Sequence, residues 1–142
     1  MVVDTSVVVK LLVDEPDSDK ADALYSSLIL GTVSLLAPDL VFVESVNALW
    51  VKTRRGELAE GEAEEKIGRL KRLCALMEIV PVESIALEAF RNACRYSHAV
   101  YDTAFLALAE SRGIRFITAD EKFYEKARRH SPAPVLLSDL TG

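Results

Sequence analysis

The chain has 142 residues, of which 50% are hydrophobic and 27% charged, and its 22 acidic and 17 basic side chains give a net charge of −5. This length suits one domain with one hydrophobic core, and the composition excludes disordered and fibrous proteins. The acidic balance argues against binding of nucleic acid by bulk electrostatics, so such a ligand would need a bound cation or a local basic cluster. We therefore expect one domain over residues 1–142.

The N-terminal segment MVVDTSVVVKLLVDEP is apolar enough to raise the question of a signal peptide or a membrane span. Asp4 and Lys10 interrupt it, no cleavage pattern accompanies it, and no other stretch reaches membrane-spanning length. We expect a cytoplasmic protein that makes no membrane contact. Cys74 and Cys94 lie in helical apolar patterns without a paired spacing, which predicts buried free thiols.

Short, mostly β-branched runs alternate with helical segments along the chain. The runs predict strands over residues 1–4, 34–37, 78–82, 115–119 and 135–138. Helical periodicity and breakers predict helices over residues 7–13, 17–31, 40–55, 60–77, 84–96, 102–113 and 121–130. Because parallel strands need crossover helices, the alternation indicates a three-layer α/β/α sandwich around a mainly parallel five-stranded sheet.

Two acidic residues, Asp4 and Asp120, directly follow the first and fourth predicted strands. Ligands of open parallel sheets bind beyond the carboxyl ends of the strands, so both acids stand where such a fold carries out its chemistry. Each is also a good helix N-cap, and so is Asp102, which precedes an apolar helical run. Capping accounts for any one of these residues taken alone.

Glu44 differs from these acids because its predicted helix is apolar on almost every face. An ionised carboxylate in such a setting is costly unless it is paired, protonated or bound to a metal. Asn47 lies three residues further along, where it either orients Glu44 or serves as a satisfied core amide. Ser6 and Thr118 each lie two residues from an acid and suit hydrogen bonds to it, although backbone capping is the commoner role.

Four carboxylates, Asp4, Glu44, Asp102 and Asp120, form a set that capping does not explain as a whole. Hard oxygen ligands without His or Cys indicate Mg²⁺ or Mn²⁺ rather than zinc. Such an ion polarises phosphoryl oxygens and lowers the pKa of an attacking water, which favours phosphodiester hydrolysis. Lys10, on the helix after Asp4, is expected to contact a phosphate or a carboxylate. The basic residues near other helix ends have two possible roles, to hold substrate phosphates near the pocket or to complement the helix dipole and face solvent, and we expect the second: Lys52, Arg54, Arg55, Arg112 and Arg115.

Four segments carry a resemblance to a known family. They are VVDTSVVVKLLVDEP at the start, APDLVFVESVNALW around Glu44, YDTAFLALAE around Asp102 and ITADEKF around Asp120, in the family's order and over nearly the whole chain. On these motifs the chain resembles PIN-domain nucleases, and specifically the VapC-type toxins of prokaryotic toxin–antitoxin pairs.

The resemblance implies that the four acids bind the metal, with Asp120 acting through water, and that Ser6, Asn47 and Thr118 are supporting polar residues. It further implies a Mg²⁺- or Mn²⁺-dependent endoribonuclease that acts on RNA, forms a homodimer and is blocked by a small antitoxin protein. A PIN-like fold is the corresponding structural expectation.

Two other classes of function remain open. A noncatalytic binding module would keep the fold and the acids but only hold a protein or an RNA. A receiver-like signalling domain would need a phosphate-accepting Asp after the third strand and a Lys after the fifth. After the third predicted strand the chain has Pro81, Val82 and Glu83, and after the fifth it has Ser138 and Asp139, so neither required residue is present.

Overall fold

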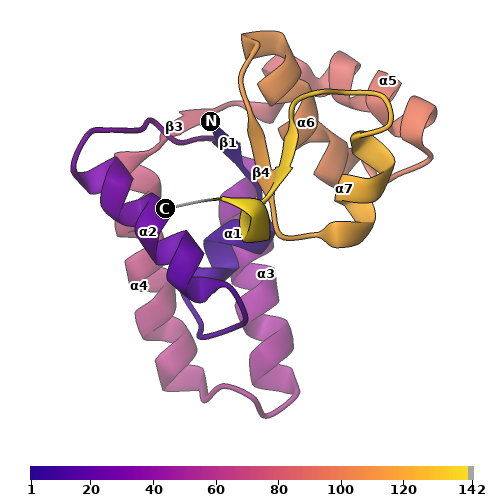
Figure 1. Ribbon diagram of the computed structural model, residues 1–142. Coiled ribbons are helices and arrows are strands. Elements are labelled where there is room, and N and C mark those ends of the chain that lie inside the picture. The colour runs from indigo at the N-terminus through magenta and orange to yellow at the C-terminus, as the bar shows by residue number, and fades with distance from the viewer. Residues whose placement is uncertain (141–142) are drawn as a thin grey trace.

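The computed structural model describes residues 1–140, and its centre is a parallel five-stranded sheet (Figure 1). The strands are β1 (Val2–Val3), β2 (Leu36–Pro38), β3 (Glu78–Val80), β4 (Phe116–Thr118) and β5 (Pro134–Leu136). They lie in the order β3-β2-β1-β4-β5, and every neighbouring pair is parallel. The predicted parallel sheet is therefore confirmed, with shorter strands than the sequence predicts.

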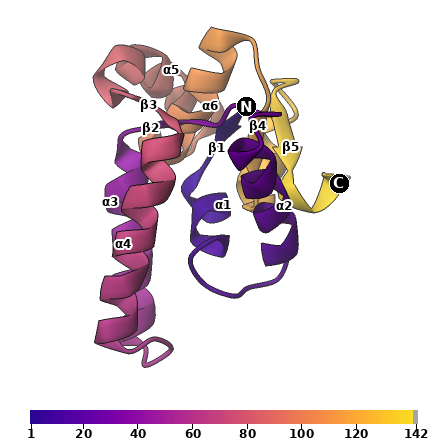
Figure 2. The same cartoon turned by 90° about the vertical axis from the view of Figure 1, so that its left-hand side faces the viewer.

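Helices cover both faces of the sheet, as the predicted sandwich requires. One side carries α1 (Thr5–Lys10), α2 (Ser18–Ile29), α3 (Leu40–Arg54) and α4 (Glu60–Leu76). The other carries α5 (Ala86–Tyr96), α6 (Val100–Arg112) and α7 (Glu121–Ala127) (Figure 1). Two short 3₁₀ helices, η1 (Val82–Ile85) and η2 (Leu137–Asp139), follow β3 and β5. Helices α3 and α4 pack together as a pair that extends beyond the sheet (Figure 2).

The core is centred on β1 and α6. Val2 and Val3 are fully buried, because α6 packs on β1, β2 and β4. Every residue of α6 from Thr103 to Ala109 is buried, which explains why this segment is apolar on all sides rather than on one stripe. This central helix therefore packs across β2, β1 and β4 on one face of the sheet.

Several boundaries differ from the prediction for physical reasons. Pro38 is the last residue of β2, because β1 pairs with β2 only at Leu36 and no ladder hydrogen bond from Pro38 is needed. Helix α6 begins at Val100, so Asp102 lies inside its first turn while Ala99 holds the cap position. The prediction that Asp102 starts this helix is therefore wrong by two residues.

The two cysteines are free but not buried. Cys94 is exposed and Cys74 is partly exposed, so the prediction of free thiols is confirmed and the prediction that both are buried is wrong. Cys94 lies on the side of α5 opposite its buried residues Ala89, Asn92 and Tyr96.

Over residues 1–140, no helix combines the length and the apolar character that a bilayer span needs.

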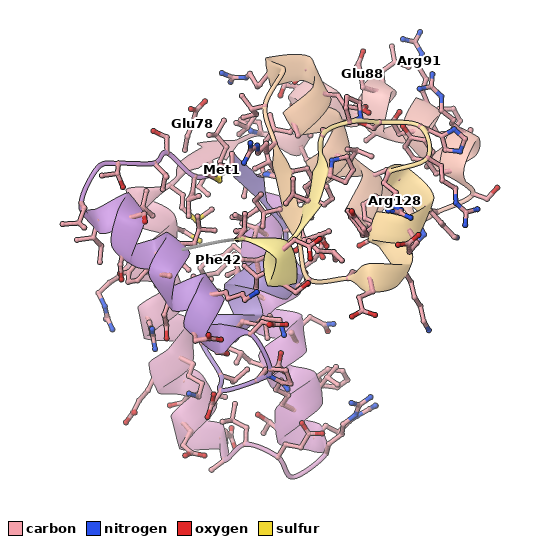
Figure 3. The ribbon with its side chains drawn as sticks, viewed as in Figure 1. Met1, Phe42, Glu78, Glu88, Arg91 and Arg128 are labelled. Atoms are coloured by element: carbon pink, nitrogen blue, oxygen red, sulfur yellow. The ribbon has the colours of Figure 1, made fainter. Side chains whose placement is uncertain are left out.

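Surface ion pairs contribute little to the stability of this fold. Glu88 and Arg91 lie side by side on α5 with 3.9 Å between their charged atoms (Figure 3). Arg112 of α6 reaches Glu78 of β3 at 3.0 Å. These side chains are about half exposed, and such pairs contribute about 0–1 kcal/mol each. Burial of the apolar core is therefore the main source of stability.

Candidate active site

The strand order reverses at the boundary between β1 and β4. The chain leaves β1 toward α1 on one face and leaves β4 toward α7 on the other (Figure 1). Asp4 and Asp120 follow these two adjacent parallel strands and lie at the same edge of the sheet. Both cap the helices that they begin: Asp4 accepts the N–H of Val7 at 3.2 Å, and Asp120 accepts the N–H of Phe123 at 2.9 Å. Capping is thus one role of each acid, and it uses only one of the two carboxylate oxygens.

Two hydroxyl groups hold the carboxylate of Asp4. Ser6 donates to Oδ1 at 2.5 Å, and Thr118 donates to Oδ2 at 2.5 Å. The N–H of Ala119 donates in turn to Ser6 Oγ, and that of Asp120 to Thr118 Oγ1. Thr118, predicted to support its neighbour Asp120, therefore gives its hydroxyl hydrogen to Asp4 across the β1–β4 pair. This network fixes the ends of the two strands and the orientation of Asp4.

Glu44 reaches the same region from α3. Thr5 Oγ1 donates to its Oε2 at 3.1 Å, whereas Oε1 is buried and accepts no hydrogen bond from the described part of the chain. An unsatisfied buried oxygen costs about 1–3 kcal/mol, and more when it carries charge. The structure thus gives Glu44 one protein partner and leaves one oxygen in need of a proton or a cation.

Asn47 does not join this group. Its residue is exposed, and the structure records no hydrogen bond between it and Glu44. The buried positions of α3 are Val41, Ser45 and Leu49, and Asn47 lies on a different side of the helix. The reading of Asn47 as a satisfied core amide is therefore wrong.

Asp102 pairs with a histidine that the sequence pattern does not single out. His98 Nε2 lies 2.7 Å from Asp102 Oδ2. The imidazole stacks on Phe123 with 4.5 Å between ring centroids, and its Nδ1 lies 3.4 Å from Lys126 Nζ. These contacts hold one oxygen of Asp102 in place. The spacing of four residues between His98 and Asp102 was the only available signal.

Burial, with a smaller contribution from neighbouring charges, raises the pKa of Asp4, Glu44 and Asp102. Burial raises the pKa of Asp4 to about 6 against its hydrogen bonds, and the charge of Asp102 adds to the rise. Burial likewise raises the pKa of Glu44 to about 7, with contributions from Asp102 and Asp4. Burial also raises the pKa of Asp102; the ion pair with His98 opposes this and the charge of Asp120 adds to it. The negative charges of Asp4, Glu44 and Asp102 therefore act on one another, and a cation near them would relieve this repulsion.

The donor set suits a hard divalent cation. All four acids offer carboxylate oxygens, and the buried Oε1 of Glu44 lacks a donor. Within residues 1–140, however, no three Asp, Glu, His or Cys side chains stand close enough to enclose an ion by themselves. Mg²⁺ commonly takes only one or two carboxylates and keeps several waters, so a loosely spaced set of acids is compatible with it.

The basic residues lie outside the acid cluster. Lys10 Nζ donates to the carbonyl oxygen of Pro16 at 2.7 Å and lies 3.6 Å from the carboxylate of Glu15. The contact of Lys10 with a carboxylate is thus present. Lys52 Nζ lies 2.5 Å from the same carboxylate, and its side chain is only 22% exposed. The prediction that Lys52 faces solvent is therefore wrong.

Comparisons with known proteins agree with this geometry. The model of the PIN domain family matches residues 1–129. Ribonuclease VapC3 of Pyrobaculum aerophilum is 32% identical over 126 residues, which cover 89% of this chain and 93% of that protein.

Three solved structures share the fold. A crystal structure of a Pyrobaculum aerophilum protein has a TM-score of 0.67 and 21% identity, covering 96% of this chain and 90% of its own. A toxin–antitoxin complex from Klebsiella pneumoniae has a TM-score of 0.66 and 14% identity, covering 98% of each chain. VapC20 of Mycobacterium tuberculosis, described as a toxin that cleaves the sarcin-ricin loop, has a TM-score of 0.63 and 18% identity, covering 87% of this chain and 92% of its own.

Proposed function

Because the chain belongs to the PIN-domain family, we propose that it is a divalent-metal-dependent endoribonuclease that hydrolyses phosphodiester bonds of RNA. The 32% identity to a protein named as a ribonuclease supports this reaction. The observation that carries the proposal is the buried, unpartnered Oε1 of Glu44 beside the charges of Asp4 and Asp102. Residues 1–142 act as a single nuclease domain.

Four acids would hold the ion, which we propose to be Mg²⁺ or Mn²⁺: Asp4, Glu44, Asp102 and Asp120. Such an ion, held by these carboxylates, would neutralise charge on the scissile phosphate and lower the pKa of an attacking water. Ser6 and Thr118 donate hydrogen bonds that favour the ionised, correctly oriented form of Asp4. Thr5 orients one oxygen of Glu44 and leaves the other free.

Cleavage of a structured RNA by the purified protein tests this proposal. We expect cutting with Mg²⁺ or Mn²⁺ and none with EDTA. Loss of a residue that only supports a metal ligand costs up to about 100-fold. Because Asp4 is a proposed ligand itself, Asp4→Asn should reduce the cleavage rate by more than this. Equal cutting by this variant would reveal a contaminating nuclease. Binding of RNA without cutting by the wild type would favour the noncatalytic module instead.

The biological role that we propose is the toxin of a toxin–antitoxin pair. The fold likeness to a chain of the Klebsiella pneumoniae toxin–antitoxin complex and the relationship to a VapC ribonuclease support it. The partner would be a small antitoxin protein that blocks the acid cluster. Inhibition of RNA cleavage by the product of a neighbouring short reading frame is the corresponding test.

A homodimer also belongs to this proposal. Large apolar side chains are exposed on three helices, α3, α5 and α6: Val43, Trp50, Leu87, Phe90, Val100 and Tyr101. Exposed apolar surface of this kind favours association with another protein surface. Sedimentation equilibrium should show a dimer, and Phe90→Ser, at a side chain that is 58% exposed, should shift it toward the monomer.

A further inference from the structure

A groove of about 440 Å³ lies between α1 and α3, next to the acid cluster. Three of its lining residues belong to the hydrogen-bond network of the site. Thr5 donates to Glu44, Ser6 donates to Asp4, and Ala119 donates its N–H to Ser6. The groove and the acid cluster therefore share a wall.

The far part of this groove is basic. Lys10, Lys52 and Arg55 line it, and Glu15 is the one acid among its lining residues in the described chain. Glu57 approaches Lys52 at 3.6 Å and Arg55 at 4.0 Å from outside the lining, with a side chain that is 48% exposed. We call this region, defined by Lys10, Glu15, Lys52 and Arg55, the basic groove. It is a local excess of positive charge in a chain whose net charge is −5.

Helix α3 joins the basic groove to the acid cluster. Glu44 and Lys52 are eight residues apart on this helix, so they lie about 80° apart around its axis and about 12 Å apart along it. Ala48 lies between them and lines the groove with only a methyl group. A polynucleotide backbone with one phosphate at the acids can therefore continue past Ala48 toward Lys52 without a bulky obstacle.

Glu15 forms ion pairs with the two lysines of the basic groove, and an incoming anion can replace its carboxylate. Its carboxylate lies between Lys52, at 2.5 Å, and Lys10, at 3.6 Å, and its side chain is 27% exposed. Its backbone is held separately, because its N–H donates to Ser18 Oγ at 3.0 Å. Lys10 also has the carbonyl of Pro16 as a fixed partner. The Glu15 carboxylate can therefore leave while the loop and Lys10 stay in place.

We propose that the basic groove binds a phosphodiester group of the RNA that flanks the scissile one, with Lys52 as the phosphate contact and Glu15 as an internal anion that this phosphate replaces. The inference rests on the proposed ribonuclease function and names the part of the protein that holds the substrate strand. Lysine contacts to phosphate supply affinity and register without reading the base sequence. Glu15 offsets part of the positive charge of the groove until a strand arrives.

Binding of a fluorescein-labelled, mixed-sequence single-stranded RNA in EDTA tests the basic groove without cleavage. Each lost phosphate contact reduces the slope of log K against log salt by about 0.7 for single strands, which amounts to about fivefold weaker binding at about 0.1 M salt. We expect this loss for Lys52→Gln. Glu15→Gln should bind several-fold more tightly, because the competing anion is gone. Lys52→Arg should retain the wild-type slope.

Lys71→Gln is the matched control, because Lys71 is an exposed lysine on α4 that does not line the groove. If Lys52→Gln and Glu15→Gln both behave like this control, the proposal is wrong. It is also wrong if Glu15→Gln weakens binding and lowers the melting temperature, because Glu15 would then be a structural tie.

The two proposals fail in different ways. RNA binding that depends on Lys52, together with no cleavage by the wild type, would overturn the nuclease and keep the groove. Cleavage by the wild type with an unchanged KM for Lys52→Gln would overturn the groove and keep the nuclease.

Discussion

Asp4 caps a helix with the same carboxylate that we propose as a metal ligand. Its Oδ1 caps α1 and accepts the hydroxyl hydrogen of Ser6, and its Oδ2 accepts that of Thr118. Burial nevertheless raises its pKa to about 6, so the hydrogen bonds offset only part of the cost of placing a charge there. The side chain is thus held in one orientation while its ionised form remains unfavourable without a cation.

The pKa values give a pH dependence for the metal-free protein. The pKa of Asp4 is raised from 3.8 to about 6 and that of Glu44 from 4.5 to about 7. Between the ordinary and the raised pKa of each acid, the folded state binds more protons than the unfolded state. Asp4 and Glu44 therefore make the free energy of unfolding fall as the pH rises through this range. In EDTA we expect the melting temperature of the wild type, relative to Asp4→Asn, to decrease from about pH 4 to about pH 6, because Glu44 is present in both proteins and the difference reports Asp4. A constant difference between the two proteins would contradict this.

His98 should matter for activity through Asp102. Its ring is fixed by Phe123 and donates to, or forms an ion pair with, Asp102 Oδ2 at 2.7 Å. Removal of a residue that orients a metal-binding carboxylate typically costs about 10–100-fold in metal affinity or activity. We expect His98→Ala to need more Mn²⁺ for half-maximal cleavage, with partial recovery in His98→Gln. An unchanged Mn²⁺ requirement would show that Asp102 needs no such support.

The chemistry-bearing side chains differ in how far the sequence reveals them. Glu44 could be predicted because a carboxylate in an almost wholly apolar helix needs a partner. The Thr118 contact with Asp4 could not, because it depends on β1 pairing with β4 across more than a hundred intervening residues. The place of His98 follows from Ser97, whose left-handed backbone (φ 48°) turns the chain before α6. Nothing in the residue type of Ser97 signals that turn.

At the scale of elements, α6 is the main structural support. The segment was predicted as an apolar helix, and the structure explains its composition by contacts with three strands and α5. It ends at Gly113, whose left-handed backbone (φ 62°) closes the last turn with hydrogen bonds to Ala109 and Glu110. The start was misplaced because Asp102 resembles a cap, whereas Ala99 holds that position without a side-chain hydrogen bond.

Two substitutions in α6 separate its buried and exposed sides. Phe105 is 1% exposed, and Phe105→Ala should reduce the free energy of unfolding by about 3–5 kcal/mol. Tyr101 is 68% exposed, and Tyr101→Ala should change it by less than about 0.5 kcal/mol when both substitutions are made in the Phe90→Ser background, where no dimer contact contributes. Urea unfolding at equilibrium measures both values. Similar losses for the two variants would mean that α6 is packed differently from the structure.

At the scale of the whole molecule, the proposed active site joins parts of the chain that lie far apart in sequence. Asp4 follows β1, Glu44 comes from α3, Asp102 from α6, and Asp120 follows β4. The alternation of strands and helices was enough to predict the sandwich. The strand order was not available from the sequence, and it is this order that places β1 beside β4 and hence the acids at one edge.

Metal binding should stabilise the whole fold, because the ion would be held by acids from several elements. At a free ion concentration of about 100 times the dissociation constant, the gain is about 2.7 kcal/mol. We expect Mn²⁺ to raise the melting temperature at about pH 7.5 and to lose much of this effect near pH 5, where protons occupy Asp4 and Glu44. Asp4→Asn should respond weakly, and a wild-type melt that Mn²⁺ leaves unchanged would count against the site.

Helix α3 runs without interruption from Leu40 to Arg54 and carries Glu44 near one end and Lys52 near the other. The distance between the proposed cleavage site at Glu44 and the proposed phosphate contact at Lys52 is consequently set by one helix and not by a flexible loop. Substrate preference would then change by substitution of side chains on α3 or within residues 11–17. The distance between Glu44 and Lys52 would stay the same, because a change in it would require a different helix.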